Sequence, residues 1–456
     1  MATDIPIPFE ALWGGTFSQL SSLEIATASA TSRVMRDAAA KAAERALEPF
    51  FAPERVRKPP HISWLEALHR AYELPRVLVI GGEDTADMPQ LHLSIITLRS
   101  TGAQHTALPV SSRPGGCSLP TGRYRLGVAR VGPLIYITGG TGPEGDPCLE
   151  VLRFDTLSHC WDNALLRPVP DRMPMPRYGH EAVSVLGRYL ICIGGKAAGT
   201  RESPEGSDDV VGGSADVLDT MTGRWMPLPC RLEYPRVYFG AAVVGSVVIV
   251  CGGMALGGRQ APPGSSEGRL ASCEILDATE LPRLFSHGPS PDMCWRRGPS
   301  LQFPRYDFSL AGPIDRFLYA VGGSGARRLV EKLDTSNLAL RPVAAEHPEV
   351  QRALLADGWV DIHTACPDLH SPTTAEADAD ADCSTPLWWG LDRVELPQSR
   401  SCGMAVSLER QLVLAGGSER AVIGYEIGSD AWEPLGAELD IMRLGAKAVA
   451  FGYPVR

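Results

Sequence analysis

Short apolar runs that end in a Gly-Gly pair recur along this chain of 456 residues. Valine, isoleucine, leucine and tyrosine dominate the runs, which is typical of strands buried on both faces. The glycine pair after each run permits a backbone turn that larger side chains would obstruct. The copies are RVLVIGG at 76–82, LIYITGG at 134–140, YLICIGG at 189–195, VVIVCGG at 247–253, FLYAVGG at 317–323 and QLVLAGG at 411–417. The pattern predicts six repeats, each built around one buried strand.

A second pattern follows most of the Gly-Gly pairs. An apolar residue, often with an acid after it, precedes an aromatic residue by seven positions, and turn residues lie between them. This spacing predicts a strand, a tight turn and a further strand. The clear pairs are Phe154 with Trp161, Leu218 with Trp225 and Tyr425 with Trp432, and the weaker pairs are Leu98 with His105 and Leu333 with Leu340. The fourth copy, at 275–283, keeps the Leu-Asp but lacks the tryptophan.

An arginine precedes the first glycine of five repeats by 16 or 17 residues. These arginines are Arg123, Arg177, Arg236, Arg305 and Arg400. A small-residue strand and a turn follow each one, so a repeat has four short strands, as one blade of a β-propeller has. The first repeat lacks its opening strand, whereas Arg443 begins a matching segment at 443–456 that has no Gly-Gly partner. We expect this C-terminal strand to complete the first blade and close the ring, which removes exposed sheet edges.

Together these marks resemble the kelch family over residues 73–456, most specifically in the second, third and sixth copies. The resemblance implies an all-β fold: a six-bladed kelch-type β-propeller closed by a C-terminal strand and preceded by a small α-helical N-terminal segment. Successive Gly-Gly pairs are 58, 55, 58, 70 and 94 residues apart, against a kelch period of about 50. We therefore expect insertions in loops, chiefly a partly disordered one at 344–396. Its acidic run at 376–383 predicts a solvated loop or, alternatively, a contact for a basic partner.

Residues 1–72 lack the repeat, and their composition predicts helices. The order of residues resembles an F-box at Pro8, Leu12, Phe17, Leu20, Leu23, Ser32, Arg33 and Arg36. Two features depart from that motif: Gly14 and Gly15 interrupt the first helix, and Met35 stands where tryptophan is usual. The resemblance implies binding to a ubiquitin-ligase adaptor through Pro8, Leu12, Phe17, Leu20 and Leu23. The alternative is a helical cap that only covers one flank of the propeller.

Charge and composition narrow the partners. The formal net charge of −10 argues against a nucleic-acid partner, which normally needs a basic face. The 22 residues of Val237–Gly258 carry no charge, but they contain a repeat and are split by Gly245 and Ser246, so we expect strands rather than a membrane span. The eleven cysteines form no C-x-x-C pair and predict neither a zinc site nor a disulfide framework. No segment reads as a signal peptide, and we expect a cytoplasmic or nuclear protein.

The sequence contains none of the catalytic motifs that we sought, and we expect no cofactor and no enzymatic activity. The arginines offer the best candidate site, because a ring of guanidinium groups near a central channel would bind the carboxylates of an acidic peptide. The predicted substrate-binding residues are Arg123, Arg177, Arg236, Arg305, Arg400, Arg443, Tyr178 and Tyr306. The alternative role for these arginines is structural: they would tie the blades together.

Three functions follow from these patterns. The first is the substrate-recognition subunit of a cullin-RING ubiquitin ligase of the F-box type. The second is a kelch scaffold that binds cytoskeletal or signalling proteins without an adaptor. The third is a small-molecule enzyme, which would require a deep channel lined by convergent titratable groups.

Overall fold

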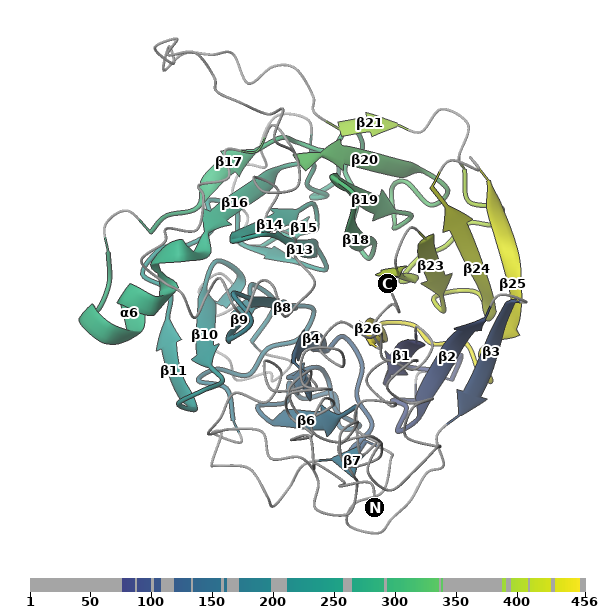
Figure 1. Ribbon diagram of the computed structural model, residues 1–456, viewed down its shortest axis with the longest axis horizontal. Helices are drawn as coiled ribbons and strands as arrows, with labels where there is room; N and C mark the ends of the chain where they lie inside the picture. The colour runs from purple at the N-terminus through teal and green to yellow at the C-terminus, as the bar shows by residue number, and fades with distance from the viewer. Residues whose placement is uncertain are drawn as a thin grey trace, which may run out of the picture.

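Six four-stranded antiparallel sheets, counted over the described residues, surround a central channel in the computed structural model (Figure 1). The structure describes residues 76–451 except 87, 100–101, 108–118, 133, 157–159, 162–171, 198–210, 257–264, 291–292, 336–337, 339–387, 391–394, 409–410 and 428–430. The predicted N-terminal helices, the F-box-like residues and the acidic run at 376–383 lie outside the described residues.

Each sheet is one blade, with its first strand nearest the channel. Blade 1 contains β26 (Lys447–Phe451), β1 (Arg76–Ile80), β2 (Leu93–Arg99) and β3 (Gly102–Ala107). Blade 2 contains β4 (Gly127–Val131), β5 (Leu134–Thr138), β6 (Val151–Asp155) and β7 (Cys160–Trp161). Blade 3 contains β8 (Glu181–Val185), β9 (Tyr189–Ile193), β10 (Ala215–Asp219) and β11 (Arg224–Pro227).

The other three blades have the same order. Blade 4 contains β13 (Gly240–Val244), β14 (Val247–Cys251), β16 (Cys273–Asp277) and β17 (Arg296–Gly298). Blade 5 contains β18 (Ser309–Ile314), β19 (Phe317–Val321), β20 (Val330–Asp334) and β21 (Trp388–Gly390). Blade 6 contains β22 (Met404–Leu408), β23 (Gln411–Ala415), β24 (Ala421–Glu426) and β25 (Trp432–Glu438). Blade 4 also carries β12 (Arg236–Val237), β15 (Met254–Ala255), η2 (Ala278–Glu280) and α6 (Leu281–His287).

The second strand of each blade is buried on both faces because a neighbouring blade covers each face. In β5, Ile135 and Ile137 pack with residues of blade 1, whereas Tyr136 packs with Leu190 of blade 3. This arrangement explains why the runs are continuously apolar rather than alternating. Burial of each large apolar side chain contributes roughly 1.5–3 kcal/mol, so contacts between blades supply much of the stabilisation.

The Gly-Gly pairs bring each blade close to the arginine of the next one. Gly139 and Gly140 have φ angles of 53° and 91°, which glycine adopts without the steric penalty of other residues. A Cβ on Gly139 would lie 2.3 Å from the carbonyl oxygen of Arg177, and the amide of Gly140 donates to that same oxygen at 3.0 Å. The glycines therefore permit contact between the backbones of successive blades.

The three clear apolar–aromatic pairs are confirmed as cross-strand partners. Phe154 lies opposite Trp161, with ring centroids 5.4 Å apart, and the pairs at 218/225 and 425/432 have the same register. The acid after the apolar residue fixes the following turn: Asp219 accepts a hydrogen bond from the amide of Met221 and two from Arg188, each at 2.7 Å.

The weaker copies differ from the prediction because the connection between the third and fourth strands is shorter in blade 1 and much longer in blade 5. In blade 1, Leu98 lies opposite Ala103, and His105 lies opposite Ile96. In blade 5, Leu333 lies opposite Trp388 rather than residue 340. The insertion precedes the fourth strand, so the predicted loop at 344–396 contains β21.

Blade 4 contains two further departures. The fourth copy has no tryptophan at 275–283, but Trp295 directly precedes β17 and packs against the core after the inserted α6. The cysteine spacing predicts no disulfide framework, but Cys251 and Cys273 form a disulfide between β14 and β16. The spacing of the two cysteines in the sequence did not predict this pairing, because the register of the two strands is what places the residues opposite each other.

The last described strand joins the first blade. β26 pairs antiparallel with β1, from Arg76 opposite Phe451 to Ile80 opposite Lys447. The uncharged stretch at 237–258 contains β13, β14 and β15. Among the described residues, no helix has the length and apolar character needed to cross a membrane.

Candidate functional site at the channel mouth

The six repeat arginines are buried inside the blades, with at most 2% of each residue exposed. Five of them donate from Nη1 to the carbonyl oxygen of the first glycine in their own repeat. These pairs are Arg123–Gly139 (3.2 Å), Arg177–Gly194 (3.0 Å), Arg236–Gly252 (3.0 Å), Arg305–Gly322 (3.0 Å) and Arg400–Gly416 (3.1 Å). Arg443 instead donates to the carbonyl of His92 and to Ser94 Oγ, at 2.9 and 2.7 Å.

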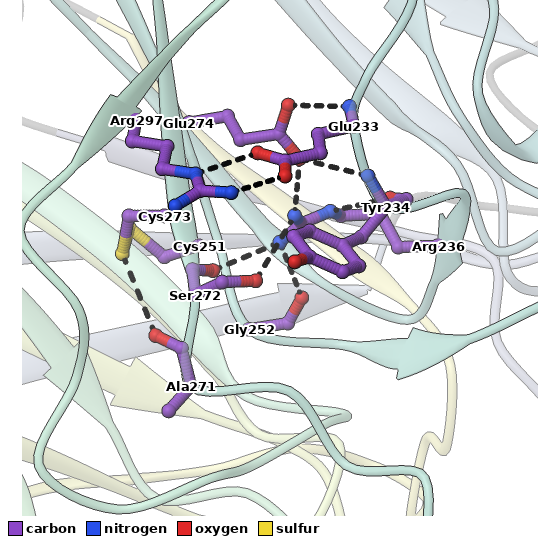
Figure 2. A network of polar contacts seen from close by, with 10 residues as sticks. All are labelled: Glu233, Tyr234, Arg236, Cys251, Gly252, Ala271, Ser272, Cys273, Glu274 and Arg297. Carbon is purple, nitrogen blue, oxygen red and sulfur yellow. Dashed lines mark hydrogen bonds and ion pairs between the residues drawn. A yellow bond between two sulfur atoms is a disulfide. The ribbon is translucent and has the colours of Figure 1, made fainter. Parts of the chain in front are cut away.

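Buried carboxylates balance the arginine charge in three consecutive blades. Asp216, Glu274 and Glu331 form ion pairs with the arginines of blades 3, 4 and 5. Figure 2 shows the pair in blade 4, where Glu274 also accepts hydrogen bonds from the backbone amides of Glu233 and Tyr234. Burial lowers the pKa of Arg236, and the carboxylate of Glu274 opposes that shift.

The guanidinium groups therefore lie inside the blades, whereas the sequence pattern predicted a ring of them at the channel. Each arginine is occupied by its own blade, and burial leaves almost no surface for a peptide. The geometry therefore favours the structural role. Tyr178 and Tyr306 are half-buried, and their backbones bridge to Lys196 and Ser324 at the ends of the Gly-Gly turns. Substrate contact by these predicted residues stays a prediction.

A different ring lies at the channel, two residues after each arginine. Its members have φ angles between 51° and 62° and are Arg125, Gly179, Tyr238, Asp307, Cys402 and Gly445. A residue other than glycine costs about 1–2 kcal/mol in this conformation, and such strain clusters at functional sites. We call these six positions the mouth ring.

Backbone hydrogen bonds hold the mouth ring from blade to blade. Among the described residues, the links from donor amide to acceptor carbonyl are Arg125 to Gly445 (2.6 Å), Gly179 to Arg125 (2.8 Å), Tyr238 to Gly179 (2.9 Å), Asp307 to Tyr238 (2.9 Å) and Cys402 to Asp307 (2.9 Å). Because five successive links fix the backbone, the side chains of the ring are held at the entrance.

The entrance contains a cavity of about 170 Å³ that all six members of the mouth ring line. Arg125 Nη1 donates to Tyr238 Oη at 2.5 Å, and its guanidinium lies 5.4 and 4.7 Å from the ring centroids of Tyr124 and Tyr238. Gly179 permits this contact, because a Cβ there would lie 2.6 Å from the Tyr238 ring. The glycine thus lets an aromatic side chain reach the arginine two blades away.

Further charged groups lie at the first positions of the inner strands. Glu181 of β8 forms an ion pair with Lys447 of β26 and so connects blade 3 to blade 1. Burial raises the pKa of Glu181, while the ammonium group of Lys447 opposes the shift. His180 is buried next to this pair, and its Nε2 lies 2.9 Å from Thr138 Oγ1. Burial, followed by the charges of Arg177 and Lys447, holds the pKa of His180 well below its usual value.

The mouth ring contains one thiol, that of Cys402. Burial raises the pKa of the Cys402 thiol to about 12, and the nearby Asp307 charge adds to this shift. A thiol with such a pKa is protonated and is a poor nucleophile. In the described chain, no group of three or more His, Cys, Asp or Glu side chains is placed to hold a metal ion.

Exposed apolar side chains lie in connections on the same face of the propeller as the mouth. Within the described residues, the large hydrophobic residues that are exposed are Met88 (57%), Met175 (36%) and Phe303 (43%). Met88 lies between β1 and β2, and the other two precede β8 and β18. The connection after a Gly-Gly pair and the connection that leads through the repeat arginine to the first strand both lie on the same face as the mouth ring. We call this surface the loop face.

Comparison with known proteins supports the assignment of the repeats. No family model matches the chain. Human Kelch-like protein 34 is 27% identical over 315 residues, which cover 64% of this chain and 43% of that protein. The matched region therefore spans less than half the length of this relative. The chain is a six-bladed propeller whose repeats are similar to those of a Kelch-like protein. Both the fold and the similarity support a protein-interaction scaffold.

The sequence patterns did not identify Arg125, Asp307 and Cys402 as residues of the mouth. A signal was present in the sequence, because each of these positions lies two residues after the repeat arginine of its blade. Glycine at 179 and 445 also indicated a left-handed conformation at that offset. What the sequence lacked was similarity among the side chains, since each blade contributes a different residue type.

Proposed function

We propose that this propeller is the substrate-recognition subunit of a cullin-RING ubiquitin ligase of the F-box type. In this proposal, the N-terminal segment binds the adaptor through Pro8, Leu12, Phe17, Leu20 and Leu23. The loop face captures the substrate, and the complex acts in the cytoplasm or nucleus. The observation that carries the substrate part is that Met88, Met175 and Phe303 are all exposed on the loop face.

Physical reasoning links those residues to protein binding. Exposed apolar side chains rimmed by polar residues are typical of interaction surfaces. Arg125 adds a positive charge on the same face, stacked between two tyrosines, and arginine with aromatic residues is the usual composition of an interface hot spot. This arrangement suits a partner that presents apolar side chains and a carboxylate, such as an acidic peptide segment.

The adaptor part rests on the F-box-like order of residues 8–36. Leu20 and Leu23 have the spacing of anchors on one face of a helix that docks in a groove. The alternative scaffold, which binds cytoskeletal or signalling proteins, uses the same loop face but needs no adaptor.

A pull-down with the purified adaptor tests the adaptor part. We expect the full chain to bind, and the variant Leu20→Asp/Leu23→Asp to lose binding while its thermal unfolding stays unchanged. Absence of binding by the full chain would reject the ligase role and leave the scaffold.

Proximity labelling in cells tests the loop face. The variant Met88→Ser/Met175→Ser/Phe303→Ser should lose at least about tenfold in labelling of its partners, because hot-spot residues each contribute about 2 kcal/mol or more. Met221→Ser is a matched control, since Met221 lies in the turn between β10 and β11 on the opposite face. Equal loss in the control would show that the loop face has no special role.

A further inference from the structure

Four charged side chains line the cavity at the channel mouth: Arg125, Glu181, Asp307 and Lys447. Glu181 and Lys447 neutralise each other in an ion pair. The other two, one positive and one negative, therefore determine which charges a ligand in the cavity would meet.

The groups in direct contact with Arg125 are neutral, and the charges of Asp307 and Glu83 act on it from farther away. Its described contacts are the hydroxyl and ring of Tyr238 and the ring of Tyr124. Four of the guanidinium's N–H donors remain after the bond to Tyr238 Oη. A carboxylate at the mouth can therefore bind this side chain without displacing an existing ion pair.

Asp307 is the corresponding negative group. Its neighbours are the Cys402 thiol, which hydrogen-bonds to the carboxylate, and the more distant charges of Arg125 and Lys447. In the part of the chain that the structure describes, no cation lies within ion-pairing distance of this carboxylate. Burial raises the pKa of Asp307 above its usual value, as expected of a carboxylate that has lost water without gaining an opposite charge in contact.

The backbone fixes the position of Asp307. Its amide donates to Tyr238, its carbonyl accepts from Cys402, both at 2.9 Å, and its φ angle is 51°. The carboxylate therefore cannot withdraw from the cavity without breaking the mouth ring. Arg125 belongs to blade 2 and Asp307 to blade 5, which are opposite blades of the six-membered ring (Figure 1).

We propose that Asp307 binds a basic side chain of the partner while Arg125, across the mouth, binds an acidic one. The ligand class is thus a protein segment that carries both a carboxylate and an ammonium or guanidinium group. This inference rests on the proposed use of the loop face for partner binding. Asp307 also selects against a segment with acids alone, because a like charge at an interface is unfavourable.

Capped synthetic peptides test the inference by isothermal titration against the full chain. One series holds a single Glu and a single Lys separated by glycine spacers of increasing length. Two further peptides hold two Glu or two Lys residues. We expect the best Glu–Lys peptide to bind at least about tenfold more tightly than the two-Glu peptide, since each charge-assisted hydrogen bond adds affinity.

Single substitutions distinguish the contribution of Asp307 to peptide binding from that of Arg125. Asp307→Asn, whose side chain tolerates the left-handed conformation, should weaken the Glu–Lys peptide about tenfold and leave the two-Glu peptide unweakened. Asp307→Gly, which copies the residue found at 179 and 445, should give the same result if Asn alters the backbone. Asp315→Asn is the control, because Asp315 also has a φ angle of 51° but lies in the turn between β18 and β19 on the opposite face.

The outcomes distinguish this inference from the proposed function. Equal binding of the Glu–Lys peptide to wild type and both Asp307 variants would overturn the role of Asp307, and so would tighter binding of the two-Glu peptide to wild type. Arg125→Met should weaken both Glu-containing peptides. If no peptide binds the wild-type chain, the inference falls, whereas the labelling experiment on Met88, Met175 and Phe303 still decides the proposed function.

Discussion

The buried arginines differ in the partners that their guanidinium groups contact. Arg305 pairs with Glu331, and both residues are 0% exposed. Arg400 donates to the carbonyls of Gly416 and Ala421, and no described carboxylate lies within 4.0 Å of it. The same repeat residue therefore has a different electrostatic role in neighbouring blades.

This difference predicts unequal costs of substitution. Arg305→Met should lower the free energy of unfolding by about 3–5 kcal/mol, because Glu331 stays buried without a partner. Arg400→Met should cost only about 1–3 kcal/mol, since it leaves carbonyl groups unpaired but no charge. Denaturant unfolding measures both values. The double variant Arg305→Met/Glu331→Leu should recover most of the loss, and no recovery would contradict the proposed origin of the cost.

His180 predicts a dependence of stability on pH. Its pKa in the folded chain is well below the usual value, so the unfolded chain binds the proton more readily. The contribution of neutral His180 is therefore fully present above the unfolded pKa of about 6.5 and is lost as the pH falls below it. When the pH is lowered from about 7.5 to about 5.5, the melting temperature of the His180→Leu variant should fall less than that of the wild type.

Leucine is a suitable replacement, because Leu126 occupies the matching position in blade 2. Thr138 keeps a hydrogen bond to the carbonyl of Gly127 in this variant. An identical loss of melting temperature in wild type and variant would assign the acid sensitivity to other groups.

Among the elements, β26 combines two contacts. It supplies the channel-side strand of blade 1 by pairing with β1, and Lys447 at its beginning forms the ion pair with Glu181 of blade 3. Both contacts connect segments that are far apart in the sequence. The strand therefore completes blade 1 and connects it to blade 3.

Removal of 443–456 should expose β1 as an unpaired sheet edge. Exposed edges pair with other chains, so we expect aggregation and a lower melting temperature, measured by light scattering and calorimetry. Addition of a peptide spanning 443–456 should restore the monomer. A truncated chain that stays monomeric with an unchanged melting temperature would show that this strand does not close the ring in solution.

In the molecule as a whole, each hydrophobic cluster is shared by neighbouring blades. One cluster joins Tyr189 and Ile191 of blade 3 with Val248 and Val250 of blade 4. Because a blade alone would expose both faces of its apolar strand, its stability depends on its neighbours.

Hydrogen exchange measures this coupling. Ile191→Ala should destabilise the shared cluster by about 2–5 kcal/mol, and amide protection should fall in β9 and β14 together. Ile137→Ala in blade 2 is the matched control and should act on blades 1 and 2. Loss of protection confined to β9 would contradict a shared core.

Much of the propeller could be predicted from local patterns. The number of repeats, the second strands, the Gly-Gly turns and the clear Phe154–Trp161 type of pair all depend on neighbours within a few dozen residues. Apolar runs, glycine and turn residues encode such short-range structure directly. The same patterns gave the wrong partner for Leu333, because the insertion separates it from Trp388 by more residues than any turn spans.

The sequence alone determined that the chain folds as six similar blades with one repeat arginine in each. Only the ring determined the partners of those arginines, the disulfide of Cys251 with Cys273, and the meeting of Arg125, Tyr238 and Asp307 at one mouth. The physical reason is distance along the chain. A repeat specifies its own strands through nearby residues, but closure of six repeats brings together side chains from different blades, whose proximity no local spacing records.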